Sequence, residues 1–137
     1  MEKVKATISW CEKNYCATSV GDIINGVVLS TNKTLEGVKR SFAEAFRFHI
    51  EGCIKDNDRL SDDIRTGNYE IEFMMDTSAL LHSLDGVLTR SAIARATGIN
   101  ERQLGHYASG IRTPRPQQRE RIINGIHAIS RELVAVV

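Results

Sequence analysis

The sequence of 137 residues predicts an α+β protein made of two parts. The first part, residues 1–75, is expected to have the order β-β-β-α-β, because short segments in it alternate between apolar and polar side chains around one long helical segment. The second part, residues 76–137, is expected to be all-helical, because short apolar segments at helical spacing begin at capping residues and end at glycines. The length suits one ordinary domain or two small ones.

Three strands are expected first. Residues 4–10 alternate between apolar and polar side chains, and residues 12–14 have the composition of a turn. A second strand is expected over residues 15–20, and Asn25-Gly26 precedes a third strand over residues 27–31. Short connections of this kind predict an antiparallel meander.

A long helix is expected over residues 35–53, with Thr34 as its cap. Residues 55–68 are polar and contain turn signals, and residues 69–75 alternate again as a fourth strand. The apolar face of the helix is expected to cover one face of the sheet. That face consists of Leu35, Val38, Phe42, Ala45, Phe46, His49 and Cys53.

Four helices are expected in the second part. Asp76 can cap the first helix, and Thr89 can cap the second, which Gly98 can end in a left-handed conformation. Asn100 can open the third helix through a capping box with the glutamine three residues later, and the last helix can start on Pro116. The last helix carries an apolar stripe of Ile122, Ile126, Ile129 and Leu133.

The composition excludes several classes of protein. The chain is 42% hydrophobic and 26% charged, as in ordinary folded proteins. No apolar run approaches the roughly 18 residues of a membrane-spanning helix, and residues 1–5 lack the apolar segment of a signal peptide, so a cytoplasmic location without a membrane partner is expected. The three cysteines have no CxxC spacing, so we expect neither a disulfide framework nor a metal site, and no cofactor.

The net charge of +1 is divided unevenly. Residues 1–75 hold 10 Lys and Arg against 12 Asp and Glu, a net charge of −2, whereas residues 76–137 hold 8 against 5, a net charge of +3. Between Leu88 and Arg121 there are seven arginines and two glutamates. This local positive charge makes nucleic acid a candidate partner.

The second and third helices of the second part have the spacing of a helix-turn-helix. Ala94 allows the two helices to approach closely, Gly98 supplies the turn, and Leu104 is expected to bury one face of the third helix. Arginine and glutamine are common readers of base edges, and cations beside helix ends favour phosphates. The alternative for the same residues is a small helical bundle whose arginines only solvate its surface. Expected base readers are Glu101, Arg102, Gln103 and His106, and expected phosphate contacts are Arg90, Arg112, Thr113 and Arg115.

Residues 88–100 resemble the helix-turn-helix of the lambda-repressor-like superfamily, and residues 106–119 continue this resemblance. Together with residues 15–17 and 26–36, they make the whole chain similar to antitoxins of the HicB type. The resemblance implies an N-terminal HicB-like domain with a partial ribonuclease-H-like fold, which binds and blocks a small basic HicA-like toxin that cleaves mRNA. It also implies a C-terminal domain that binds operator DNA and represses its own operon.

The same sequence offers two alternative functions. A ribonuclease-H-like domain could itself be a nuclease, but such chemistry needs clustered carboxylates that hold divalent metals, and the first three strands carry no acidic residue in their interiors. We therefore expect no catalytic residues and no enzyme. The second alternative, a stand-alone helix-turn-helix repressor with an N-terminal sensing or dimerisation domain, stays open.

The last helix predicts an oligomer. Its stripe, with Ile126, Ile129 and Leu133 as candidate dimer contacts, offers more apolar surface than a small monomer usually exposes. A two-fold homodimer would place two reading helices about 34 Å apart, although a higher homo-oligomer is also open.

Overall fold

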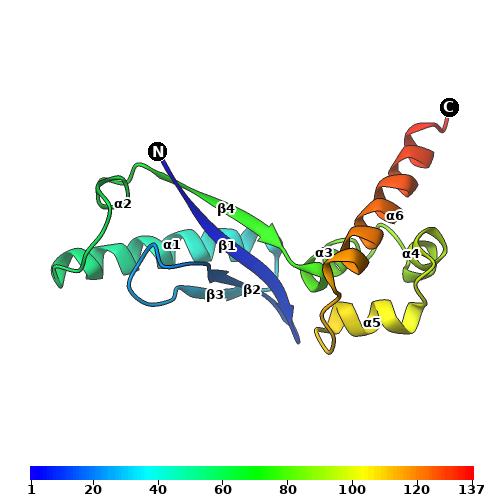
Figure 1. The fold of residues 1–137 in the computed structure, drawn as a ribbon, viewed down its shortest axis with the longest axis horizontal. Coiled ribbons are helices and arrows are strands. Elements are labelled where there is room, and N and C mark those ends of the chain that lie inside the picture. The colour runs from blue at the N-terminus through cyan, green and yellow to red at the C-terminus, as the bar shows by residue number, and fades with distance from the viewer. The chain divides into compact units, whose positions relative to one another are not determined.

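The computed structural model describes residues 1–137 and has an α+β architecture, as the sequence predicts. The chain divides into two compact units, unit 1 (Met1–Asp76) and unit 2 (Thr77–Val137), one residue beyond the expected boundary. Unit 1 holds all four strands and two helices, and unit 2 holds four helices (Figure 1). None of the helices combines the length and apolarity needed to cross a membrane.

Unit 1 contains a mixed sheet of four strands in the order β3-β2-β1-β4. The expected antiparallel meander is confirmed for β1 (Glu2–Cys11), β2 (Asn14–Ser19) and β3 (Leu29–Asn32). The last strand, β4 (Tyr69–Met75), returns to pair in parallel with β1. The sheet therefore ends in two edge strands, β3 and β4.

The third strand begins two residues later than expected. The Val28 amide donates to the hydroxyl of Ser19 at 2.9 Å, so this residue is held by a side chain just before the regular pairing starts at Leu29. The residues between β2 and β3 form a loop, in which Gly26 has a φ of 92°. This loop reaches the helix described next.

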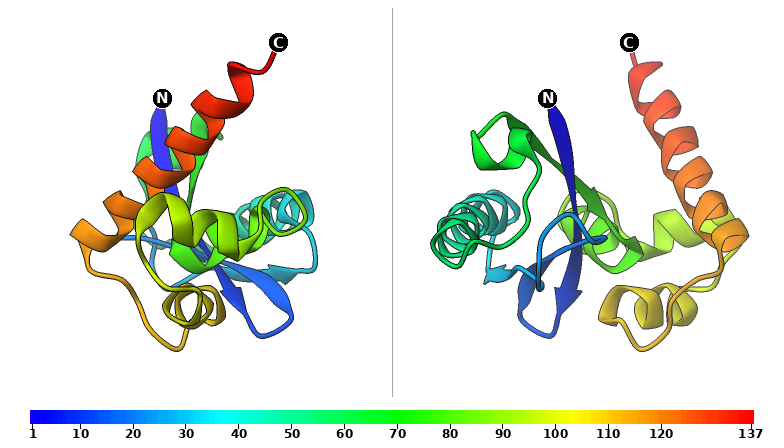
Figure 2. Two further views of the ribbon diagram at one scale, coloured as in Figure 1. Left: turned by 90° about the vertical axis from the view of Figure 1, so that its right-hand side faces the viewer. Right: turned by 60° about the vertical axis from the view of Figure 1, so that its left-hand side comes forward.

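Helix α1 (Leu35–Lys55) lies along one face of the sheet, as Figure 2 shows, and no element of unit 1 covers the other face. The expected cap is confirmed, because the Thr34 hydroxyl accepts from the Gly37 amide at 3.0 Å. A side chain at Gly37 would overlap Asn32, whose own amide oxygen accepts from the Thr34 amide at 3.1 Å, so the capping turn itself requires a glycine there.

The core of unit 1 lies between α1 and the sheet. Most of the expected helix face is buried, but Ile50 joins it unexpectedly while Leu35, Ala45 and His49 are only half-buried. The rings of Phe42 and Phe73 meet edge to face at 5.7 Å. The buried side chains of this core include Val4, Ala6, Ile8, Tyr15, Ala17, Val38, Phe42, Phe46, Ile50 and Cys53.

A short helix, α2 (Asp62–Arg65), lies in the segment expected to be irregular. The Ser61 hydroxyl caps it by accepting from the Ile64 amide at 3.2 Å, and Ile64 is almost fully buried. Four residues are too few to show helical periodicity, so the pattern of the sequence could not reveal this helix.

Unit 2 consists of α3 (Thr77–Ser83), α4 (Arg90–Thr97), α5 (Glu101–Ser109) and α6 (Pro116–Val134), close to the expected positions. All four helices, together with the turn between α4 and α5, supply side chains to one core. Its buried members are Leu81, Ile93, Ile99, Leu104, Tyr107, Ala108 and Ile122.

Candidate nucleic-acid interface

Helices α4 and α5 are joined by a sharp turn that local chemistry defines. The hydroxyl of Thr89 accepts from the Ala92 amide at 3.0 Å, and this cap starts α4. Gly98 ends α4 with a φ of 74°, a left-handed conformation that glycine adopts without strain. The side-chain oxygen of Asn100 accepts from the Gln103 amide at 2.8 Å and starts α5. All three of these expected turn and cap assignments are confirmed.

The expected capping box is only half formed. The side chain of Gln103 does not return to Asn100; its amide nitrogen donates to the Tyr107 hydroxyl at 2.8 Å. Tyr107 is buried, so this bond gives its hydroxyl a partner inside α5. Gln103 is therefore partly engaged in holding its own helix.

Thr97 of α4 and Gly125 of α6 make a tight contact between these two helices. A Cβ at Gly125 would overlap the Thr97 methyl group and lie 3.5 Å from the carbonyl carbon of Ala96. The buried Thr97 hydroxyl donates to the Ile93 carbonyl at 2.8 Å and accepts from the Ile99 amide at 3.2 Å. Sequence reasoning considered only an approach between α4 and α5, at Ala94, and missed Gly125, although a glycine next to the apolar stripe of α6 was a usable signal.

The predicted base readers on α5 differ in exposure. Glu101 and Arg102 are exposed at the start of the helix, whereas Gln103 and His106 are half-buried. The prediction that all four are exposed is therefore correct for Glu101 and Arg102 and wrong for Gln103 and His106, which lie beside the core-facing residue Tyr107. The part of α5 open to a partner is its first turn.

A groove of about 320 Å³ lies between the end of α5 and the start of α6. No acidic residue lies in the first turn of α6, and Arg115 caps it without a side-chain hydrogen bond, so the partial positive charge of this helix end is not neutralised locally. The groove thus favours an anion. It brings together four predicted residues, Gln103, Arg112, Thr113 and Arg115, and adds Tyr107, Gln117 and Gln118, of which the two glutamines were missed.

Two arginines of unit 2 are engaged in the structure of the unit itself. Arg90 is half-buried, and its Nη2 lies 3.5 Å from Asp85 Oδ1, so this predicted phosphate contact is already paired. Nη1 of Arg119 donates to the Thr77 hydroxyl at 2.9 Å. Six other arginines of unit 2 are exposed and have no ion-pair partner: Arg95, Arg102, Arg112, Arg115, Arg121 and Arg131.

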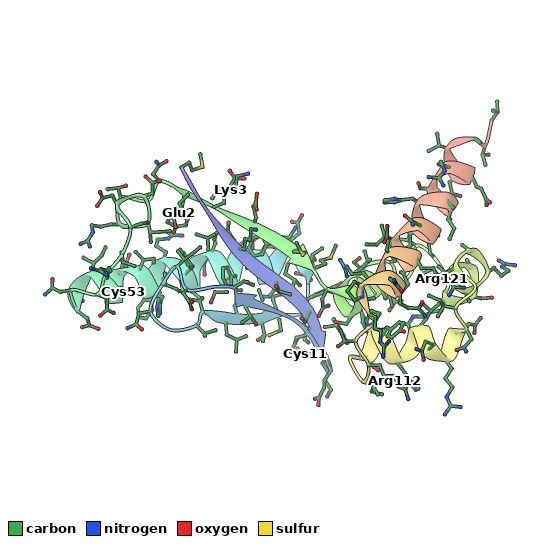
Figure 3. The ribbon with its side chains drawn as sticks, in the orientation of Figure 1. Glu2, Lys3, Cys11, Cys53, Arg112 and Arg121 are labelled. Carbon is green, nitrogen blue, oxygen red and sulfur yellow. The ribbon has the colours of Figure 1, made fainter.

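The guanidinium of Arg121 lies against the turn between α4 and α5. A Cβ at Gly98 would be 2.7 Å from Arg121 Nη2. Figure 3 labels this side chain on α6 and Arg112 on the loop after α5. The exposed cations therefore come from separate segments of unit 2: α4, the start of α5, the loop that follows it, and α6.

His82 of α3 lies next to the Arg90–Asp85 pair. Its Nδ1 is 3.5 Å from Asp85 Oδ2, and its ring is also hydrogen-bonded to the backbone of Ala108 in α5. Burial lowers the pKa of His82 below its ordinary value, and the positive charge of Arg90 lowers it further, although Asp85 opposes both effects. The neutral imidazole is therefore the form favoured in the folded unit at neutral pH.

No cluster of three or more His, Cys, Asp or Glu side chains is arranged to hold a metal ion. The three cysteines are free thiols, and Cys53 is buried. Burial raises the pKa of the Cys53 thiol, and the neighbouring Asp58 raises it further, so the less reactive protonated form is favoured.

Comparison with known proteins gives no further evidence about the function of the chain. No family model matches the chain, and neither a curated protein nor a solved structure matches it. The case for function therefore rests on the geometry and charge described above.

Proposed function

We propose that the chain is an antitoxin and repressor: unit 2 binds operator DNA, and unit 1 binds and blocks a small basic HicA-like toxin that cleaves mRNA. In this proposal unit 2 is a lambda-repressor-like helix-turn-helix domain and unit 1 is a HicB-like domain with a partial ribonuclease-H-like fold. The chain itself has no catalytic role. The observation that carries the proposal is the capped pair α4 and α5, with Arg102 exposed at the start of α5 and a cationic groove beside it.

The first turn of α5 would enter the major groove. There the exposed Arg102 can donate two hydrogen bonds to the edge of a guanine, and Glu101 can accept from a cytosine. Gln103 and His106, which are half-buried, would reach only bases that approach the helix closely. Reading is thus concentrated in two side chains.

The groove beside α5 would hold the DNA backbone. Arg112, Thr113 and Arg115 line it together with the start of α6, and an arginine, a hydroxyl and a helix N-terminus are all groups that bind phosphate. Contacts of this kind set the register of the protein on the duplex and make binding depend on salt.

A homodimer would match two half-sites in an operator. Ile126 and Ile129 pack against the core of their own unit, so they contribute less to an interface than the sequence suggested. Beyond them the end of α6 stays apolar and open, with Leu133 exposed by 61% and Val134 by 85%. We place the dimer contact at this end of α6.

The test uses the full chain in two assays. Fluorescence anisotropy should show tighter binding to a duplex taken from upstream of the chain's own gene than to a random duplex of equal length. Coexpression should restore growth to cells that express the small basic protein encoded beside that gene. Specific DNA binding without rescue would favour the stand-alone repressor, and failure of both would refute the proposal.

A further inference from the structure

Unit 1 has an open groove of about 420 Å³ between α1 and the loop that leads into β3. Three apolar side chains line it while remaining largely in solvent: Val27 is exposed by 69%, Leu29 by 58% and Phe48 by 78%. We call this surface the Phe48 groove. Exposure of three large apolar side chains to water is unfavourable, so a cluster of this kind indicates a binding surface.

The walls of the Phe48 groove are held in place without a partner. His49 Nε2 lies 2.6 Å from the Asn25 carbonyl oxygen, and this hydrogen bond fastens the loop to α1. The loop also passes close to the imidazole at Gly26, where a Cβ would be 3.4 Å from His49 Cε1. A preformed groove lowers the cost of binding because little has to be ordered when a partner arrives.

The charge of the groove is negative. Asp56 and Asp58 line it, and neither carboxylate has an ion-pair partner. Glu44 and Glu51 lie four residues before and three residues after Phe48, which places them beside it on the same face of α1. Two cations lie nearby, Lys55 one turn beyond Glu51 and Arg59 directly after Asp58, and these four carboxylates outnumber them.

These features select one kind of occupant. The carboxylates would repel the phosphates of a nucleic acid, and a second copy of the same groove would bring four more carboxylates against them. A protein segment that carries an apolar side chain between lysines or arginines matches both the apolar floor and the acidic rim.

We propose that the Phe48 groove is the docking site for a basic protein segment, which inserts an apolar side chain between Phe48, Val27 and Leu29 and pairs its cations with Asp56 and Asp58. The identification of this segment as part of the toxin rests on the proposed antitoxin function. The groove itself is defined by unit 1 alone.

The experiment selects random displayed peptides on the full-length protein and measures their affinity by fluorescence polarisation. The selected peptides should contain an aromatic or aliphatic residue flanked by lysine or arginine. Phe48→Asp, Phe48→Ala and Asp56→Lys should each weaken binding by about tenfold or more, because these side chains lie at the centre of the contact. The matched control is Met74→Asp on β4, since Met74 is also exposed, by 66%, but does not line the groove.

The control variant should bind like the unchanged chain, and all variants should keep its circular dichroism spectrum. Absence of enriched peptides, enrichment of peptides without basic residues, or binding that survives both Phe48 substitutions would overturn the proposal. The small protein encoded beside the gene is then tested on the same variants. If it binds equally to the chain and to Phe48→Asp, the antitoxin function stands and the identification of the docked segment as part of the toxin is refuted; if only the peptides bind, the groove stands and the antitoxin function fails.

Discussion

Gly98 offers the sharpest test of how the turn between α4 and α5 is built. Two physical effects meet at this residue: its φ of 74° favours glycine, and the guanidinium of Arg121 occupies the space where a Cβ would lie. Gly98→Ala introduces both effects together. Further substitutions can separate them.

We expect the left-handed backbone conformation of Gly98 to contribute more to the loss of stability than the contact between the added Cβ and Arg121. A left-handed conformation costs an L-residue about 1–2 kcal/mol, whereas Arg121 is a long exposed side chain that can move away at little cost. We therefore expect Gly98→Ala to lower the free energy of unfolding of unit 2 by about 1–2 kcal/mol. Gly98→Asn should cost less than half as much, because asparagine adopts left-handed φ values more readily while carrying the same Cβ.

The assay is urea denaturation followed by circular dichroism, with the only tryptophan, Trp10, as an internal reference because it lies in unit 1. Its fluorescence transition should not shift. In an Arg121→Ala background Gly98→Ala should cost the same to within about 0.5 kcal/mol, as expected for residues that do not couple. Equal losses for alanine and asparagine, or a loss that disappears in the Arg121→Ala background, would refute the backbone explanation.

Three further outcomes are expected. Arg102→Ala should cost about 1–3 kcal/mol on the preferred duplex and less on random DNA, whereas Arg112→Ala should weaken all duplexes alike and reduce the salt slope by about one; equal losses of Arg102→Ala on both duplexes would contradict base reading. Burial lowers the pKa of His82, so the unfolded chain binds a proton at this residue more tightly than the folded unit does. Unit 2 should therefore be most stable above about pH 6.5 and lose stability as the pH falls below it. The urea midpoint of His82→Gln should depend less on pH across that range. Light scattering should show a dimer that Leu133→Glu converts to a 15.3 kDa monomer, and a monomeric unchanged chain at micromolar concentration would contradict the proposed interface.

The sequence alone predicted those features of the structure that depend on residues close together in the chain. Thr34, Thr89 and Asn100 each cap the helix that follows, because each side chain accepts a hydrogen bond from a backbone amide three residues later. Gly98 ends α4 because glycine adopts the left-handed backbone conformation at this position without strain. The periods of two and of three to four also predicted the strands and the long helices, since they reflect which side of an element is buried.

Features that join distant segments were decided by the tertiary structure. The parallel pairing of β4 with β1 joins segments more than sixty residues apart, and the burial of Ile64 stabilises α2 despite its length of 4 residues. The sequence marked the arginines of unit 2 as one positive segment, but it could not show that Arg90 is paired with Asp85 while Arg102 is exposed without an ion-pair partner.

The Phe48 groove shows the same limit. Phe48 is one apolar residue on a charged side of α1, and Val27 and Leu29 belong to a different segment of the chain. The hydrogen bond between His49 and Asn25 and the packing of α1 on β3 bring the two segments together. Local chemistry determined which elements this chain forms, whereas the contacts between elements decided which of its charged and apolar side chains remain available to a partner, because availability depends on what the rest of the fold has already paired or buried.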